Sequence, residues 1–405
     1  MKNKRVIIAI IASLLIVVLI AISLIYFNTQ ENNVEIKSSL KAYNAELQEN
    51  EHMHIDVDSS GDKVAVPNGY VGSKVAGENE IDTGYVIYEG TEEVNNENVE
   101  EAQKTRNQYV WIPVPDVSKM YGTDANGKKW GKLYEFTTDS GNNIDEATGT
   151  KPLNWSESDG VITILDKNSY REPEIAIKYF DLDNNLKNLN MEMNKSHEFL
   201  MQLEKEFDNM LNSIEKYEGF YIGRYESGDL SKEKVVIKKG NTDISNQSWY
   251  TMYNKCKTLK TENVNIETGL IWGNQYDRVL MWLIESGNKT KEEISIDSTG
   301  WANYRSSTFE YINTNNEKVI KGKDGATRIP TGSTEYTIAN NIYDLAGNVY
   351  DSTMEVSFKN IFSKDFRIIR GGGYYNTKMA SFRDDTYQIS DKYGDVGCRA
   401  MLYIK

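Results

Sequence analysis

Three consecutive glycines near the C-terminus, Gly371 to Gly373, are followed by residue types that can recognise a polar ligand. The glycines come after an apolar, β-branched segment, so they place backbone without side chains at the end of a strand, where a ligand or another backbone can approach closely. Aromatic rings give contact area at a low entropic cost, while amide and charged groups fix the orientation of a ligand. We therefore predict ligand-binding residues at Tyr375, Asn376, Arg383 and Asp384.

The residue types of common catalytic sites do not occur in a usable pattern. The sequence has no Gly-x-Ser-x-Gly elbow, no phosphate-binding loop and no His-Glu-x-x-His helix, and its three histidines are His52, His54 and His197. The spacing of His52 and His54 would place both on one face of a strand, which suits a metal, but their acidic and amide neighbours favour a polar linker. The sequence therefore predicts no catalytic residue.

Two cysteines, Cys256 and Cys398, lie far apart in the sequence. They can form a disulfide if the domain is extracellular, because disulfides persist in oxidising compartments. A single disulfide would not be the scaffold of a chain of 405 residues.

The composition limits the class of partner. With 60 acidic against 46 basic residues the formal charge is −14, which argues against nucleic acid because the sequence shows no concentrated basic face. The lysine-rich stretch 255–260 is interpreted as solvated surface. A length of 405 residues with 39% hydrophobic residues suits one large irregular domain with appendages.

The N-terminus has the pattern of a membrane anchor. Residues 1–5 form a basic tail with Lys2, Lys4 and Arg5, and residues 6–27 contain no charged side chain. As a helix this segment would span roughly 33 Å, which matches the hydrocarbon core of a bilayer. It lacks the short apolar region and the cleavage site of a secretory signal, so we predict an uncleaved transmembrane helix with the rest of the chain outside the cell. The polar residues 28–63 are predicted to form a stalk.

From Val64 onward, short apolar runs broken by Gly, Asn and Pro predict strands at 64–71, 83–88 and 108–115. Residues 117–189 are rich in Asn, Asp, Gly and Lys, which predicts an insertion of loops and short strands. A helix is predicted over 196–217, because Ser196 can cap its N-terminus and apolar residues recur at helical spacing. A second helix is predicted over 274–284, with Tyr276, Val279, Leu280 and Leu283 facing inward.

Four C-terminal segments occur in an order that resembles a known family. They are Asn-Ile-Tyr-Asp-Leu-Ala-Gly-Asn-Val-Tyr-Asp-Ser (341–352), Arg-Ile-Ile-Arg-Gly-Gly-Gly-Tyr-Tyr (367–375), Ser-Phe-Arg (381–383) and Gly-Cys-Arg (397–399). The formylglycine-generating enzyme, or sulfatase-modifying factor, family carries Tyr-Asp-x-x-Gly-Asn-Val-Trp-Glu-Trp, Arg-Gly-Gly-Ser-Trp and Gly-Phe-Arg in the same order. The resemblance covers residues 64–405 and implies that family's α+β fold with an irregular C-type-lectin-like core. Residues 109–115, Tyr-Val-Trp-Ile-Pro-Val-Pro, look like the N-terminal strand of anchored bacterial members.

The resemblance also implies that the family's chemistry is absent. Catalytic members oxidise a substrate cysteine with two cysteines five residues apart, and the matching positions hold Asn376 and Ser381, which cannot supply a thiolate. Cys398 replaces a phenylalanine that points into the core, which favours a buried structural thiol. We therefore predict a catalytically silent, membrane-anchored extracellular protein that binds a protein or a glycan. The alternative is an oxidoreductase of the family's type, or another enzyme, with a displaced active site.

Two further expectations follow from the same resemblance. The family binds calcium in the Gly-Asn-Val-Trp-Glu segment, which implies a structural Ca²⁺ held by Asn348, Val349 and Asp351. The predicted ligand-binding residues would line the former catalytic cleft. The alternative is that Tyr374 replaces the family's tryptophan in the core and that the charges around it are solvated.

Overall fold

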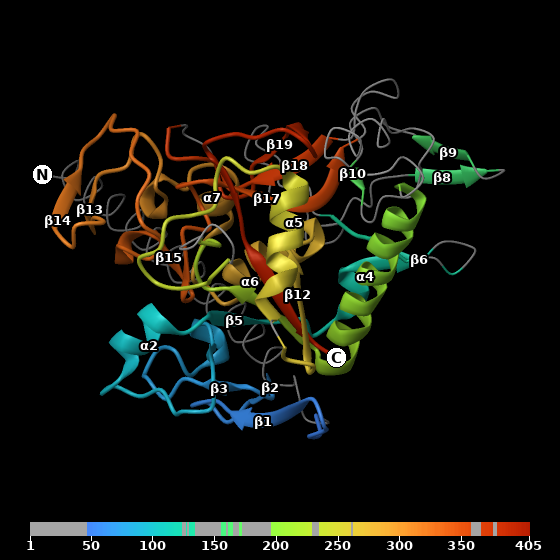
Figure 1. Cartoon of the computed structure of the whole chain (residues 1–405), viewed down its shortest axis with the longest axis horizontal. Coiled ribbons are helices and arrows are strands. Elements are labelled where there is room, and N and C mark those ends of the chain that lie inside the picture. Colours follow the sequence, from blue (N-terminus) through green and yellow to red (C-terminus); the bar gives the residue numbers. More distant parts are fainter. Residues whose placement is uncertain are drawn as a thin grey trace, which may run out of the picture.

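The computed structural model describes residues 47–123, 127, 129–133, 155–158, 161–164, 170–171, 196–228, 235–260, 262–357, 366–375 and 379–405. Two larger sheets and several helices form the body of the molecule, so the predicted α+β class is confirmed (Figure 1). The largest sheet is antiparallel, with six strands in the order β12-β21-β11-β5-β4-β3. Its strands are β3 (Tyr70–Gly72), β4 (Val86–Glu89), β5 (Gln108–Pro113), β11 (Gly219–Gly223), β12 (Ile266–Leu270) and β21 (Ala400–Ile404).

Strands β5 and β11 are neighbours inside this sheet, and every residue in them is buried. Their apolar sequences are typical of strands that are covered on both faces. Trp111 of β5 packs edge-to-face against Tyr221 of β11, with ring centroids 4.9 Å apart. Strand β5 therefore confirms the strand predicted over 108–115, and both of its faces are buried.

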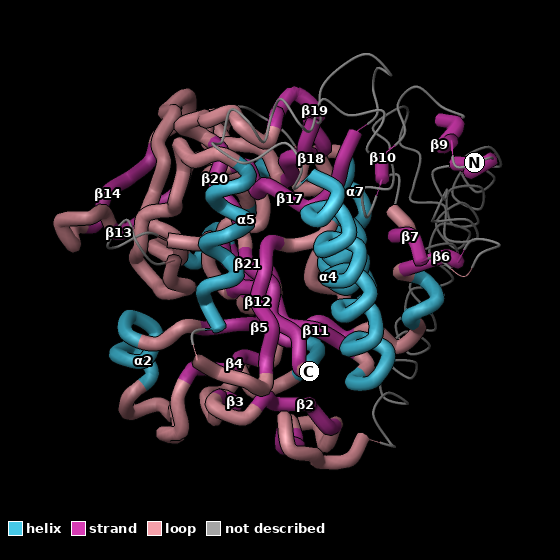
Figure 2. Tube along the Cα trace, turned by 45° about the vertical axis from the view of Figure 1, so that its right-hand side comes forward, coloured by secondary structure: helices cyan, strands magenta, loops and turns pink. Residues whose placement is uncertain are grey.

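Three helices pack against the six-stranded sheet. Helix α4 (Ser196–Tyr217) has the predicted bounds and lies on β11 and β21, while α5 (Trp249–Lys257) lies on β12 (Figure 2). The predicted apolar stripe of α4 is buried at Phe199, Leu203, Phe207, Met210, Leu211 and Ile214. Helix α6 (Gly273–Glu285) confirms the second predicted helix, with Tyr276, Val279, Leu280 and Leu283 buried.

The second sheet carries the C-terminal motif segments. Its strands are β10 (Tyr170–Arg171), β17 (Tyr350–Ser357), β18 (Phe366–Arg370) and β19 (Arg383–Gln388), in the order β10-β17-β18-β19, and β20 (Val396–Cys398) pairs in parallel with β17. The glycine run follows β18 directly. The Trp249 indole of α5 donates to the Thr353 carbonyl of β17 at 2.8 Å, which joins α5 to this sheet.

Short elements complete the described chain. Five two-stranded pairs are β1 (Met53–Val57) with β2 (Lys63–Pro67), β6 (Tyr121–Thr123) with β7 (Lys129–Gly131), β8 (Trp155–Ser158) with β9 (Val161–Ile164), β13 (Phe309–Ile312) with β14 (Lys318–Lys321), and β15 (Ile338–Ala339) with β16 (Ile342–Tyr343). Short α-helices are α2 (Val99–Thr105) and α7 (Lys291–Ser295). Single 3₁₀ turns occur at Ile81–Thr83, Val117–Lys119, Thr258–Lys260, Thr299–Trp301 and Glu335–Thr337.

The predicted cytoplasmic tail (1–5) and transmembrane segment (6–27) lie outside the described residues. None of the helices in the part of the chain that the structure describes is long and apolar enough to cross a membrane. Strand β1 lies within the range predicted as a stalk. It pairs with β2, and its first residue, Met53, is buried in the core. The packed structure therefore begins ahead of Val64, because the apolar side chain of Met53 is covered there.

Candidate functional site

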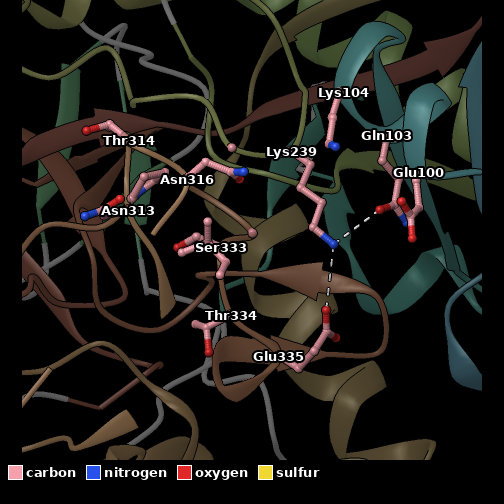
Figure 3. A pocket seen from close by; sticks show the side chains of 14 residues that line it. Glu100, Gln103, Lys104, Lys239, Asn313, Thr314, Asn316, Ser333, Thr334 and Glu335 are labelled. Atoms are coloured by element: carbon pink, nitrogen blue, oxygen red, sulfur yellow. Dashed lines mark hydrogen bonds and ion pairs between the residues drawn. The ribbon is translucent and has the colours of Figure 1, made fainter. Parts of the chain in front are cut away.

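A pocket of about 580 Å³ opens where helix α2 faces the turn between β13 and β14 (Figure 3). Four segments build its walls: helix α2, residues 239–240, the turn 312–316 and residues 330–335. Its polar lining residues are Glu100, Gln103, Lys104, Lys239, Asn313, Thr314, Asn316, Ser333, Thr334 and Glu335. The volume falls within the usual range for small-molecule sites.

Lys239 provides a positioned positive charge in this pocket. In Figure 3 its amine points between Gln103 and Glu335. The Nζ atom donates to Gln103 Oε1 at 3.2 Å and lies 3.9 Å from Glu335 Oε1. Partial burial lowers the pKa of the Lys239 amine, and the nearby Glu335 carboxylate acts in the opposite direction. The side chain is 30% exposed, so a ligand can reach the amine.

Gln103 links Lys239 to a buried ion pair behind the pocket. While its carbonyl accepts from Lys239, its amide donates to Glu78 Oε1 at 3.1 Å. Glu78 in turn pairs with Arg224 at 2.7 Å, and both side chains are buried. Because both ends of the Gln103 amide are engaged, its orientation and that of the Lys239 amine are fixed.

The opposite wall of the pocket supplies the carboxylate of Glu335. The Tyr343 hydroxyl donates to both carboxylate oxygens of Glu335 at 2.9 Å. Ser333 lines the pocket, and its buried Oγ has no hydrogen-bond partner. The pocket thus presents a cation and a carboxylate that hydrogen bonds within the protein hold in place.

The motif loop 341–351 has a backbone that explains its residue types. Asn341, Asp344, Gly347 and Asn348 all have left-handed backbones, with φ values of 62°, 58°, 82° and 57°. Glycine adopts this region freely, and Asn and Asp tolerate it better than other residues. These residue types therefore serve the path of the backbone, whatever else they bind.

Asn348, the first predicted calcium ligand, uses its oxygens within the protein. Its side-chain oxygen accepts from Asn303 Nδ2 and from the Ile329 amide, both at 3.0 Å. Its carbonyl oxygen accepts from the amide of Tyr374 at 2.8 Å. Its Nδ2 donates to the buried carboxylate of Glu226 at 2.5 Å. Asn348 is therefore the hydrogen-bonding centre of the motif loop.

The other two predicted calcium ligands lie beside charged side chains. The amide of Val349 donates to Glu226 Oε1 at 3.1 Å, and Asp351 Oδ2 accepts from Arg399 Nε at 3.1 Å. The Arg399 guanidinium thus neutralises the Asp351 carboxylate. The other oxygen of this carboxylate, Oδ1, has no hydrogen-bond partner. Calcium takes six to eight oxygen ligands. The described residues contain no group of three or more His, Cys, Asp or Glu side chains that could hold a metal. Two of the oxygens predicted to bind calcium, Asn348 Oδ1 and Asp351 Oδ2, already accept hydrogen bonds within the protein.

Millimolar calcium is expected to leave the melting temperature of the chain unchanged. A structural ion at ~100 times its dissociation constant would add roughly 2.7 kcal/mol, which a melting curve detects easily. Melting curves with calcium and with a chelator measure this directly. A calcium-dependent rise that the Asp351→Asn variant abolishes would restore the predicted site.

The glycine run brings two pieces of backbone together. The Gly371 carbonyl accepts from the Gly347 amide at 3.0 Å and from the Tyr304 hydroxyl at 2.8 Å. A Cβ atom on Gly371 would lie 2.7 Å from the Leu345 carbonyl oxygen. The sequence predicted that either a ligand or another backbone approaches the glycine run. At Gly371 the structure shows the backbone of the motif loop in this place.

Two of the predicted ligand-binding residues, Tyr375 and Arg383, bind carboxylates of the protein itself. Tyr375 is 38% exposed, and its hydroxyl donates to Asp395. Arg383 is bound by carboxylates of its own chain, as described below, and Asp384 lies opposite Ile369 in the sheet. Asn376 lies outside the described residues. The Lys239 pocket is lined by none of these residues.

Arg383 belongs to a cluster of four charged side chains. Arg370 binds Asp277 Oδ1 at 2.6 Å and Glu355 Oε2 at 3.3 Å, while Arg383 binds Glu355 Oε1 at 2.8 Å and the second oxygen of Asp277. Two positive and two negative groups are thus balanced in a buried site. The cluster ties helix α6 to strands β17, β18 and β19.

Among the residues compared with catalytic thiols and the histidines, the structure describes the side chains of Ser381, His52 and His54. Ser381 is buried and its amide donates to the Ile294 carbonyl at 3.1 Å. His52 Nδ1 contacts Asn265 at 3.3 Å, whereas His54 Nδ1 contacts Asn68 at 3.4 Å. The two rings therefore have separate partners.

Sequence reasoning missed the Lys239 pocket. Its walls come from four segments that span residues 100–335, so no local spacing connects them. Lys239 itself follows another lysine and precedes a glycine and an asparagine, a pattern typical of a solvated turn.

Comparisons with known proteins leave the family unassigned. By sequence, the chain matches no protein-family model and no curated protein. Among solved structures, one titled "Crystal Structure of CarF" aligns with a TM-score of 0.30 and 12% identity, over 46% of this chain and 87% of that chain. This likeness is too weak to carry an argument. The resemblance to the sulfatase-modifying factor family stays a prediction.

Proposed function

We propose that the chain is a membrane-anchored cell-surface protein that binds an extracellular polar ligand in the Lys239 pocket. The observation that carries the proposal is the pocket's pair of fixed, opposite charges: the Lys239 amine and the Glu335 carboxylate. The lining that the structure describes includes no histidine and no cysteine, which favours binding over proton transfer or thiol chemistry.

A saccharide is the ligand class that fits this pocket best. Each sugar hydroxyl both donates and accepts a hydrogen bond, so one ligand can satisfy the Lys239 amine and the Glu335 carboxylate together. The volume of about 580 Å³ suits a small ligand better than a protein surface. Of the two partner classes expected from the sequence, the pocket therefore supports the glycan.

The remaining parts of the proposal rest on the sequence. The uncharged segment 6–27, with its basic tail, supports a single-pass anchor, and the order of the C-terminal motifs supports a C-type-lectin-like, sulfatase-modifying-factor fold over 64–405. Both cysteines, Cys256 and Cys398, are buried, which disfavours the alternative of an oxidoreductase with a displaced thiol.

Thermal-shift titration with neutral sugars, amino sugars and sugar acids tests the proposal. One of these classes is expected to raise the melting temperature of the purified chain, because a ligand at ~100 times its dissociation constant stabilises the native state by roughly 2.7 kcal/mol. Lys239→Gln should abolish the shift. The Lys239 side chain contributes to the pocket wall and is 30% exposed, so the variant should fold.

Tyr375→Phe is the matched control. It alters the predicted face next to the glycine run and leaves the pocket intact, so the ligand-induced shift should persist. The reverse pattern, in which Tyr375→Phe loses the shift and Lys239→Gln keeps it, would move recognition to that face. Binding of a protein instead of any sugar, lost in Lys239→Gln, would keep the site and change the ligand class.

A further inference from the structure

The two cysteines of the chain meet in the core although 142 positions separate them in the sequence. Their Sγ atoms are 3.6 Å apart, and both residues are completely buried. A random placement of two buried residues in a domain of this size would seldom bring their sulfur atoms into contact. The pair links helix α5 to strand β20.

Helix α5 holds Cys256 in a fixed position. Its buried residues Trp249, Met252, Tyr253 and Cys256 recur at helical spacing and form one face. Ser248 caps the N-terminus by accepting from the Thr251 amide. The Trp249 ring is also covered by the Arg367 guanidinium, 3.9 Å from its centroid. The helix cannot rotate about its axis without breaking these contacts.

Cys398 is held equally firmly. It pairs with Ser352 in the parallel β17–β20 ladder, and its carbonyl accepts from the Ser227 amide at 2.9 Å. The next residue, Arg399, binds Asp351 and the carbonyl oxygens of Gly223 and Tyr343. Two rigid elements therefore present the thiols to one another.

We propose that Cys256 and Cys398 form a disulfide in the mature protein, which cross-links helix α5 to the C-terminal sheet. An S–S bond is about 2.05 Å long, so the sulfur atoms must approach by about 1.5 Å, which small side-chain rotations provide. The proposal rests on the extracellular placement in the proposed function, because disulfides persist in oxidising compartments.

The bond forms by thiol–disulfide exchange with a disulfide donor. One thiolate attacks the donor disulfide and releases a donor thiol; the second cysteine, as its thiolate, then attacks the mixed disulfide and releases the other donor thiol. The two cysteines are oxidised and the donor disulfide is reduced to two thiols. The two protons that the cysteines lose are gained by these donor thiols. Burial, together with the hydrogen bond between the two sulfurs, raises the pKa of the Cys398 thiol. Exchange therefore belongs to folding, before the core closes.

Alkylation of the full chain tests the proposal. The chain, isolated from its membrane and denatured without reductant, is treated with iodoacetamide and weighed by mass spectrometry. The expected result is no alkylation before reduction and two alkyl groups after it. Cys256→Ala and Cys398→Ala should each gain one alkyl group without reductant, which shows that the reagent reaches both positions. Two alkyl groups on the unreduced wild type would overturn the proposal.

Stability gives a second readout. A reductant should lower the melting temperature of the wild-type chain and leave the Cys256→Ala/Cys398→Ala double variant unchanged, because the cross-link restricts the unfolded chain. An equal response of the two proteins would contradict the disulfide.

Two further measurements separate this proposal from the proposed function. If the two cysteines are reduced in the chain from cells, the proposal is wrong. Refolding the chain with oxidised and reduced glutathione then shows whether the geometry of the pair or the compartment of the protein prevents the disulfide. If the disulfide is present while no ligand raises the melting temperature, the proposed function fails and the disulfide stands.

Discussion

Asp277→Asn is expected to lower the free energy of unfolding by about 3–5 kcal/mol, the usual cost of breaking a buried ion pair on one side. Asp277 is fully buried and contacts both Arg370 and Arg383. With its charge removed, the Arg370 and Arg383 guanidinium groups keep Glu355 as a shared carboxylate partner in a largely buried site. Urea denaturation of the purified variant and wild type gives the difference.

The matched control is Glu310→Gln, which breaks an exposed ion pair of similar geometry. The N–O distance is 2.5 Å between Lys318 and Glu310 and 2.6 Å between Arg370 and Asp277. The side chains of the first pair are 66% and 53% exposed, whereas those of the second are completely buried. Water screens the exposed pair, so its loss should cost about 0–1 kcal/mol. Equal costs for the two variants would show that burial does not set the strength of the cluster.

A charge-balanced variant tests the same cluster from the opposite direction. Adding Arg383→Gln to Asp277→Asn leaves Arg370 paired with Glu355, so the site is neutral again. The double variant should therefore be more stable than Asp277→Asn alone, and the difference from additivity measures the coupling. A purely additive loss would contradict a cluster that acts as a unit.

The sequence was sufficient for elements whose buried face is set by their own neighbours along the chain. Helices α4 and α6 repeat apolar residues every three or four positions, and β5 is apolar on both faces, so periodicity placed them. Helix α5 was not predicted because it is nine residues long and Lys255 and Lys257 interrupt its apolar pattern in the sequence. Strand β1 was not predicted because its Asp and His residues resemble the polar segment before it. Its pairing with β2, which no local pattern shows, makes it a strand.

The candidate site was less predictable because tertiary contacts decide what each polar residue does. Arg383 looked available for a ligand, but Asp277, on a helix more than a hundred positions earlier, binds it. Asn348 looked suited to calcium, but Asn303 and Tyr374 use its oxygens. The residues around Lys239 have the pattern of a solvated turn, but Gln103 and Glu335 hold its amine in a pocket. Each partner comes from a distant segment that no local spacing identifies.

The glycine run, in contrast, allows a sharp prediction, because two separate effects act at Gly371. Its φ of 81° lies in the left-handed region, where a Cβ atom costs roughly 1–2 kcal/mol. A Cβ there would also lie 2.7 Å from the Leu345 carbonyl and 2.9 Å from the Tyr276 hydroxyl, two groups that are hydrogen-bonded to each other. Overpacking of this kind adds about 1–3 kcal/mol.

Gly371→Ala is therefore expected to lose about 2–5 kcal/mol of unfolding free energy, and Gly77→Ala about 1–2 kcal/mol. Gly77 isolates the backbone effect, because its φ is 84° and a Cβ atom on it would meet nothing within 4 Å. Urea denaturation of both variants measures the difference, which reports the packing of the glycine run on the motif loop. If the two variants lose the same free energy, backbone conformation alone requires glycine at 371. The close contact between the run and Leu345 would then contribute nothing to stability.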